Sequence, residues 1–124
     1  MEDKKFNREK GRKGENLAVT YLETRGYKIL DRNWIFEKIE LDIIAEKDGI
    51  VVFVEVKARK NNDYGYPEEG VNVAKQENIL EAAEEYLDAK DLDQEIRFDI
   101  ISITGVAGHE NIHHIMDAIS PYDI

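Results

Sequence analysis

Residues 38–60 read KIELDIIAEKDGIVVFVEVKARK, a pattern that predicts a β-hairpin. Two runs rich in β-branched residues flank Asp48-Gly49, a dipeptide that favours a tight two-residue hairpin turn. This turn fixes which residues face each other across the hairpin. Asp42 then lies opposite Glu55, between pairs that are mostly apolar: Leu41 with Val56, Ile43 with Val54 and Ala45 with Val52.

The opposed carboxylates of Asp42 and Glu55 indicate a cation site. Directly opposed strand residues have Cβ atoms roughly 4.5–5.5 Å apart. Two carboxylates at that separation repel each other unless a cation or a proton lies between them. Mg²⁺ and Mn²⁺ prefer oxygen ligands. We therefore expect Asp42 and Glu55 to hold Mg²⁺ or Mn²⁺, with the carbonyl oxygen of Val56 as a third ligand. Lys57 faces the same side as Glu55, opposite Glu40.

Length and composition predict one globular domain. The chain has 124 residues, of which 42% are hydrophobic, and it has no cysteine. A disulfide framework and a zinc–thiolate site are therefore excluded. The first residues, MEDKKFNREKGRK, lack the apolar centre of a signal peptide, and no apolar run approaches the roughly 18 residues of a membrane span. We expect a mobile basic arm at 1–10, a single domain at 11–124, no membrane partner and a cytoplasmic location.

The charge distribution is uneven. The net charge is −10, from 17 basic and 27 acidic residues, which is unfavourable for binding phosphate backbones. However, residues 1–13 hold six Lys or Arg against three acids, and further basic residues follow Glu55 in the sequence. Residues 77–95 hold eight acids and one lysine. The sequence therefore predicts a basic end and an acidic flank.

Hydrophobic periodicity predicts the order α-β-β-β-α-β-β. Helices are expected where apolar residues recur at helical spacing, and strands where β-branched and aromatic residues form short runs. A strand, a helix and a strand in succession favour a parallel crossover, and strands joined by short turns favour an antiparallel arrangement. The run VVFVEV, apolar on both faces for most of its length, indicates a central strand. We expect an α/β fold with a mixed, twisted, five-stranded sheet flanked by helices. The expected helices are 11–25 and 75–89, and the expected strands are 27–35, 38–46, 50–59, 96–104 and 111–117.

The acidic pair and the lysine resemble the motif of the PD-(D/E)xK nuclease superfamily, in which Asp42, Glu55 and Lys57 would be the defining residues. The longer pattern resembles the YraN-like family over roughly residues 11–104. This pattern departs from the family at Ile39, where glycine is usual, and at Ala58, where threonine is frequent. The matching stretches are Gly11–Ala18, Tyr21-Leu22, Gly26-Tyr27, Ile29-Leu30, Asn33-Trp34, Glu40–Ala45, Phe53–Arg59, Pro67, Glu69, Val71, Lys75-Gln76 and Arg97–Asp99.

The resemblance implies a restriction-endonuclease-like fold, similar to that of archaeal Holliday-junction resolvases. It implies a metal-dependent nuclease, or a nuclease-like protein, that hydrolyses phosphodiester bonds in branched or single-strand-containing DNA. Lys57 would stabilise charge on the reacting phosphate, and Gln76 would contact the phosphate or Glu55. Glu15, on the rim of the first helix, would be a further metal ligand. A resolvase cuts two strands symmetrically, so a homodimer is implied.

Contacts to DNA are expected from the basic residues near the motif and from one loop aromatic. Lysine and arginine supply the phosphate contacts, and a tyrosine can stack on a base. The candidates are Arg12, Lys13, Arg59, Lys60, Tyr64 and Lys75.

Two other functions remain open from the sequence. One is a catalytically silent nucleic-acid-binding module that keeps the fold, in agreement with the net charge of −10. The other is a protein-interaction domain that uses the acidic second helix against a basic partner.

Overall fold

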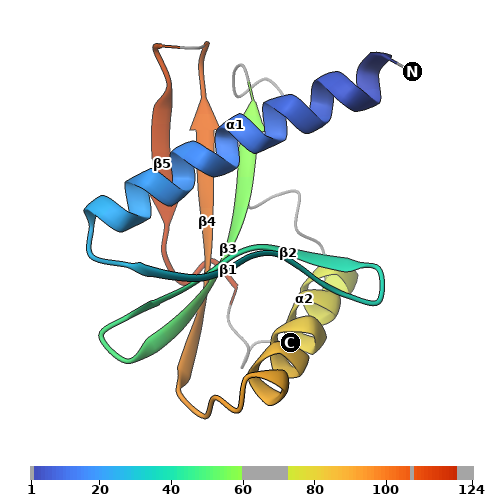
Figure 1. The fold of residues 1–124 in the computed structure, drawn as a ribbon, viewed down its shortest axis with the longest axis vertical. Coiled ribbons are helices and arrows are strands. Elements are labelled where there is room, and N and C mark those ends of the chain that lie inside the picture. Colours follow the sequence, from blue (N-terminus) through green and yellow to red (C-terminus); the bar gives the residue numbers. More distant parts are fainter. Residues whose placement is uncertain (1, 60–72, 107, 120–124) are drawn as a thin grey trace.

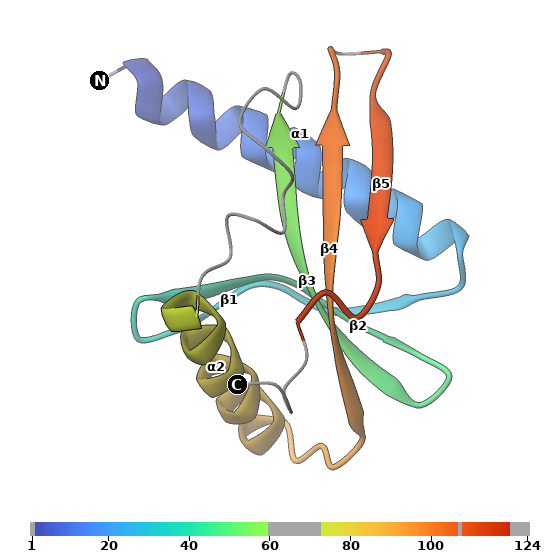
Figure 2. The same ribbon diagram turned by 180° about the vertical axis from the view of Figure 1, so that it is seen from behind.

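The fold is a five-stranded mixed sheet with one helix on each face, as seen in the computed structural model from the front (Figure 1) and from behind (Figure 2). The structure describes residues 2–59, 73–106 and 108–119, with the backbone alone described for 2–12, 59 and 73–75. The helices are α1 (Glu2–Thr24) and α2 (Val73–Ala89). The strands are β1 (Lys28–Phe36), β2 (Ile39–Lys47), β3 (Ile50–Arg59), β4 (Glu95–Thr104) and β5 (Asn111–Ile115).

The predicted fold class and element order are confirmed. The strands lie in the order β1-β2-β3-β4-β5, so β3 is central. β3 pairs antiparallel with β2 and parallel with β4, and α2 forms the connection between β3 and β4. Among the described residues, neither helix has the length and apolar character that a membrane crossing requires.

The C-terminal end of α1 agrees with the helix predicted from the sequence, and its N-terminal end differs from it. Gly26 ends the helix as expected: it has φ 89°, and the amides of Gly26 and Tyr27 donate to the carbonyls of Glu23 and Leu22. This is a Schellman motif, which satisfies the last helical carbonyls. The start differs, because α1 begins at Glu2 rather than at residue 11. The polar sequence before residue 11 has no apolar stripe from which a helix could be predicted.

The hairpin turn is the predicted one. Asp48 has φ 53° and Gly49 has φ 80°, the left-handed pair that a type I′ turn requires. The register follows from it: Ile43 pairs with Val54, and Ala45 pairs with Val52. The paired region of β2 and β3 runs from Lys47 and Ile50 to Ile43 and Val54.

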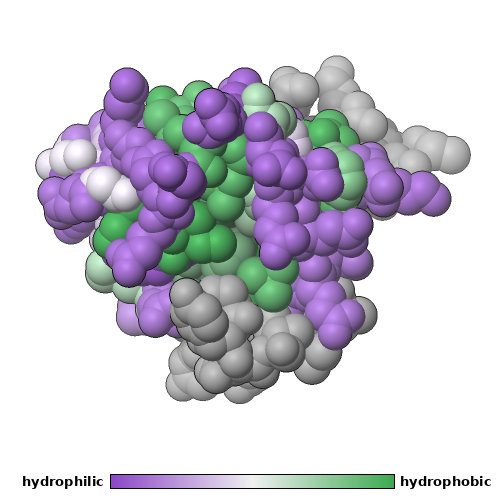
Figure 3. Space-filling view, turned by 90° about the horizontal axis from the view of Figure 1, so that it is seen from below, coloured by the Kyte–Doolittle hydropathy of each residue, from purple (hydrophilic) through white to green (hydrophobic). Residues whose placement is uncertain are grey.

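Each face of the sheet has its own apolar cluster. The cluster under α2 contains Phe53, Phe98 and Tyr86. The cluster under α1 contains Leu22, Val54 and Ile101. On the surface seen from below, apolar residues gather between hydrophilic flanks (Figure 3). The buried apolar area of the two clusters is the main stabilising contribution in a domain of this size.

The hairpin of β1 and β2 changes face part-way along its length. Ile43 belongs to the cluster under α1, whereas Leu41, two residues away, belongs to the cluster under α2. In a regular strand, such residues would share one face. On β1, the partners of Ile43 and Leu41 are Arg32 and Trp34. Between them lies Asn33, whose φ of 53° is left-handed. The change of face therefore occurs at Asn33 and Asp42.

α1 approaches β3 closely because residue 14 is glycine. A Cβ atom on Gly14 would lie 2.8 Å from the Cβ atom of Ala58, closer than real Cβ contacts allow. Ala58, one of the two positions at which the chain departs from the family pattern, therefore has a packing role. The small residues at both positions bring the part of α1 around Gly14 and Glu15 close to β3.

We predict that Gly14→Ala lowers the free energy of unfolding by about 1–3 kcal/mol, because overpacking at a close contact outweighs the gain in helix propensity. Urea denaturation measures the change. Thr20→Ala, at an exposed position of α1, is the matched control and leaves stability unchanged or slightly higher. Adding Ala58→Gly to Gly14→Ala removes the clash and should restore part of the loss. A double variant that is additively worse than both single variants would contradict this account.

Candidate metal and phosphodiester site

Asp42 lies where β2 stops pairing with β3. Its Oδ2 atom accepts a hydrogen bond of 2.9 Å from the backbone amide of Val56, two residues beyond the last paired residue of β3. The side chain thus takes the place of a strand carbonyl and satisfies an amide that would otherwise be left unpaired. Because of this bond, β1 and β2 diverge from β3 while the Val56 amide still has an acceptor.

Asp42 and Glu55 line one pocket. The pocket walls are otherwise mostly apolar and include Leu41, Phe53, Ile79, Phe98 and Ile119. Burial raises the pKa of Asp42 to about 7, and the charges of Glu55, Glu15 and Glu40 also raise this pKa. The hydrogen bond from the Val56 amide acts in the opposite direction. Three other carboxyl groups thus act on the half-buried carboxyl group of Asp42. A cation bound there would relieve both the repulsion and the loss of hydration.

Lys57 pairs with Glu55. Its Nζ atom lies 3.5 Å from Oε1 of Glu55, and both side chains are mostly buried, with 21% and 17% of their surface exposed. The sequence had placed Lys57 opposite Glu40. Because regular pairing of β2 with β3 extends only as far as Ile43 and Val54, the register does not fix the Glu40–Lys57 pair. The ammonium group is nevertheless held next to the pocket, as the sequence-based hypothesis requires.

Glu15 is buried on α1, with 8% of its surface exposed. Its Oε1 atom accepts hydrogen bonds from Nε of Arg32, at 2.9 Å, and from Nδ2 of Asn33, at 2.8 Å. The sequence predicted Glu15 as a metal ligand. In the structure its charge acts on Asp42, but one of its oxygens is already engaged by β1.

The carboxylate oxygens of Asp42 and Glu55, in a strongly negative pocket, are ligands of the kind that hard divalent cations prefer. Among the described residues, no three His, Cys, Asp or Glu side chains are grouped closely enough to hold a metal ion. Asp42 and Glu55 would therefore supply two protein ligands, with the Val56 carbonyl as the predicted third. Water and phosphate oxygens commonly complete the shell of Mg²⁺.

The other predicted site residues are placed as follows. Gln76 is half-buried near the start of α2, and Lys13 is exposed on α1. Arg12, Arg59 and Lys75 lie in α1, β3 and α2, but their side chains are outside the described part of the structure, and Lys60 and Tyr64 lie outside the described residues altogether. The contacts of these residues with DNA remain predictions.

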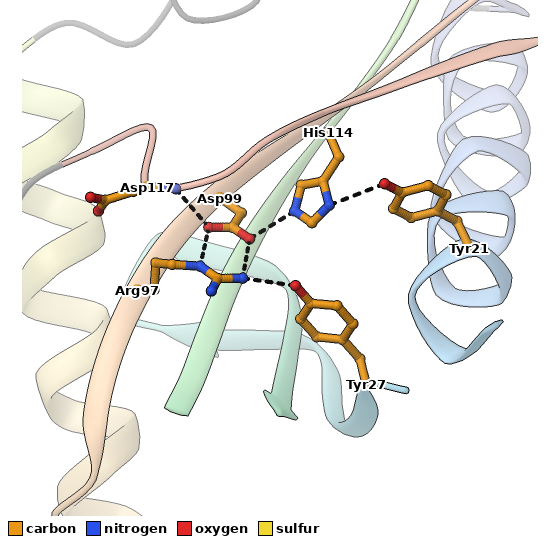
Figure 4. A network of polar contacts seen from close by, with 6 residues as sticks. All are labelled: Tyr21, Tyr27, Arg97, Asp99, His114 and Asp117. Atoms are coloured by element: carbon orange, nitrogen blue, oxygen red, sulfur yellow. Dashed lines mark hydrogen bonds and ion pairs between the residues drawn. The ribbon is translucent and has the colours of Figure 1, made fainter. Parts of the chain in front are cut away.

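A second polar cluster joins α1, the connection between α1 and β1, β4, β5 and the residues that follow β5 (Figure 4). Asp99 is buried, with 1% of its surface exposed. It accepts two hydrogen bonds from Arg97, at 2.9 Å each, and one from the amide of Asp117, and lies 2.7 Å from Nε2 of His114. These partners hold the pKa of Asp99 below its usual value despite the opposing effect of burial.

The cluster extends to two tyrosines on the α1 side of the sheet. Nη2 of Arg97 donates to the hydroxyl of Tyr27 at 2.8 Å, and the hydroxyl of Tyr21 lies 3.3 Å from Nδ1 of His114. The sequence alone predicts no structural role for Arg97, Asp99 or His114. The signal that could have revealed them is the spacing of Arg97 and Asp99, which puts two opposite charges on one face of an otherwise apolar strand.

The comparisons with known proteins agree with the resemblance seen in the sequence. Residues 14–103 match the family described as "Uncharacterised protein family UPF0102", which is the YraN family. The chain belongs to this family. The UPF0102 protein of Flavobacterium psychrophilum is 46% identical over 108 residues, covering 87% of this chain and 91% of the relative. The UPF0102 protein of Bacteroides thetaiotaomicron is 44% identical over 113 residues, covering 91% and 93%.

A third relative, the UPF0102 protein of Persephonella marina, is 44% identical over 110 residues, covering 88% of this chain and 91% of the relative. The matches therefore extend over nearly the whole domain rather than a single motif. They include the region of Asp42, Glu55 and Lys57, since the family match spans residues 14–103.

We predict that Asp42→Asn stabilises the metal-free protein above pH 7. The pKa of Asp42 is raised from 3.8 to about 7, so the folded state favours the protonated form. The stabilising contribution of this proton is full below pH 4 and is lost as the pH rises toward 7. Asparagine keeps an oxygen for the Val56 amide and has no charge. The gain should be roughly 2–4 kcal/mol at pH 8 and near zero at pH 4.

Urea denaturation in EDTA at the two pH values measures this difference. Glu81→Gln, an exposed acid on α2, is the matched control, for which no comparable gain is expected. Equal stabilities of Asp42→Asn and the original protein at pH 8 would show that the Asp42 carboxylate is not destabilised by its surroundings.

We predict that Asp99→Asn lowers the free energy of unfolding by about 3–5 kcal/mol at pH 7, because it removes the charge that compensates Arg97 in a largely buried pair. Tyr21→Phe removes one outer hydrogen bond and should lower it by only about 0.5–1.5 kcal/mol. The pKa of Asp99 is lowered, so its contribution is present above pH 4 and is lost as the pH falls through the folded-state pKa. A loss that is the same at pH 7 and at pH 2 would refute this electrostatic explanation.

Proposed function

We propose that this protein is a metal-dependent nuclease, or a nuclease-like protein, that acts on branched or single-strand-containing DNA. The observation that carries the proposal is the position of Asp42, held by the Val56 amide in a pocket that it shares with Glu55. The repulsion and burial that raise the pKa of Asp42 to about 7 destabilise the protein unless something binds there. Binding sites commonly hold such perturbed groups.

The chain's own residues would divide the chemistry as follows. Asp42 and Glu55 would hold Mg²⁺ or Mn²⁺, which, when bound, polarises a phosphate oxygen and makes a water molecule more acidic. Lys57 would place its ammonium group beside the phosphate, where it stabilises the negative charge that grows during attack. Its pairing with Glu55 favours the charged form, so an electrostatic role is preferred to that of a base.

The buried walls of the pocket would limit water around these groups. Phe53, Ile79 and Phe98 lie beside the carboxylates, and charge–charge interactions are stronger away from bulk water. Gln76, near the start of α2, would orient the phosphate or Glu55. The homodimer required for symmetric cleavage of a branched substrate is part of the proposal.

One observation favours a second function, that of a catalytically silent nucleic-acid-binding module. Among the described residues, no three His, Cys, Asp or Glu side chains are grouped so that they could hold a metal ion, and the net charge is −10. Such a module would bind DNA with or without a divalent cation and would leave its phosphodiester bonds intact.

Cleavage assays with fluorescent four-way, flap and single-stranded DNA in Mn²⁺ distinguish the two functions. For a nuclease, we expect cleavage that is lost in Asp42→Ala combined with Glu55→Ala and falls about 100- to 1,000-fold in Lys57→Ala, the range for the loss of one transition-state contact. Glu84→Gln, an exposed acid on α2, is the control and should retain full activity. Cleavage that persists in the double variant would rule out this site, and binding without cleavage would favour the silent module.

A further inference from the structure

We propose that Arg32 is a substrate-phosphate contact that Glu15 holds back until a divalent cation binds at Asp42 and Glu55. This inference rests on the proposed function of that site. It assigns a role to Arg32, which the sequence-based site did not include. It also gives Glu15 a role that differs from that of a permanent metal ligand.

The first observation is the geometry of the Arg32 contacts. Its Nε atom donates to Oε1 of Glu15 at 2.9 Å, and its Nη2 atom donates to Oδ1 of Asn16 at 2.6 Å. The guanidinium group is therefore held by two neighbouring residues of α1. It is not enclosed, because 37% of the Arg32 side chain is exposed, against 10% of the Glu15 side chain. An arginine at this depth can reach a ligand by rotating away from α1.

The second observation is that Glu15 contacts the residue that lies across from Asp42. Asn33, whose Nδ2 atom donates to Oε1 of Glu15, lies opposite Asp42 in the pairing of β1 with β2. One carboxylate is thus subject both to the Arg32 guanidinium and to the place where a cation would bind. A divalent ion carries twice the charge of a guanidinium group, and its attraction for a carboxylate at similar distance is larger in proportion.

The third observation is the location of Arg32 and Asn33 at the change of strand face. Asn33 has φ 53° and donates to the same Oε1 atom of Glu15 as Arg32 does. Asp42 lies between the β2 partners of Arg32 and Trp34, namely Ile43 and Leu41. Arg32, Glu15 and Asp42 are therefore gathered at one point, where α1 crosses the hairpin.

The chemistry of the released group fits phosphate. Arginine keeps its charge at any working pH and presents paired N–H donors that match two phosphate oxygens. In the metal-free protein, Glu15 competes for the same donors, and the neighbouring acids repel DNA. A bound cation would reduce both effects together. The affinity for DNA should therefore rise more steeply with the concentration of the divalent cation than charge neutralisation alone explains.

DNA binding in EDTA tests the restraint by Glu15 without any metal. Fluorescence anisotropy with a labelled four-way junction compares Glu15→Gln with Glu23→Gln, an exposed position on the same helix with the same change of charge. Glutamine keeps an oxygen acceptor for Arg32 and Asn33, so the fold is retained, and thermal unfolding checks this. We expect about threefold to tenfold tighter binding for Glu15→Gln than for Glu23→Gln. Adding Arg32→Gln should abolish that gain. Equal affinities of the two single variants would overturn the proposal.

A magnesium titration of the unaltered protein, followed by NMR, tests the release itself. The side-chain Nε–H signal of Arg32, assigned with Arg32→Lys, should move toward the position of an exposed arginine as Mg²⁺ saturates Asp42 and Glu55. If the carboxyl signals of Asp42 and Glu55 respond while the Arg32 signal stays unchanged, the inference about Arg32 fails and the metal site stands. If none of the three signals responds to Mg²⁺, the proposed metal site fails and the release mechanism fails with it.

Discussion

The hydrogen bond from the Val56 amide to the Asp42 carboxylate is the interaction on which the site depends. It forms where the pairing of β2 with β3 stops, at Ile43 and Val54. A strand that separates from its neighbour normally leaves an amide in need of an acceptor, and a carboxylate is a strong one. The same bond fixes the position of the carboxylate. Structure and candidate chemistry therefore depend on the same side chain, and Asp42→Asn separates the two, because asparagine keeps the acceptor for the Val56 amide and removes the charge.

The separation of the strands also explains why groups from both faces of the sheet reach this point. Leu41 packs under α2 and Ile43 packs under α1, so the hairpin turns through the plane of the sheet at Asp42. Glu15 approaches from α1 because Gly14 lies against Ala58. A continuous ladder would have kept these groups on opposite sides. The raised pKa of Asp42 is the electrostatic result of this convergence.

Much of the fold followed from local sequence signals. Asp48-Gly49 fixed the hairpin register, the doubly apolar run of β3 indicated a central strand, and Gly26 ended α1. The same register predicts Asp42 opposite Glu55, but regular pairing stops one residue earlier, at Ile43 and Val54, and the two side chains line a common pocket. The change of face at Asn33 did not, because nothing in the alternation of β1 predicts a left-handed residue. The Glu15–Arg32 pair and the Asp99 cluster join residues that are far apart in the sequence, and such contacts depend on tertiary packing that local patterns do not contain.

Anomalous diffraction from a crystal soaked in Mn²⁺ tests the proposed cation site directly. If Asp42 and Glu55 hold a divalent cation, an anomalous peak lies between their carboxylates, within coordination distance of both. An occupied Mn²⁺ position elsewhere on the protein, with that pocket free of anomalous density, would contradict this proposal.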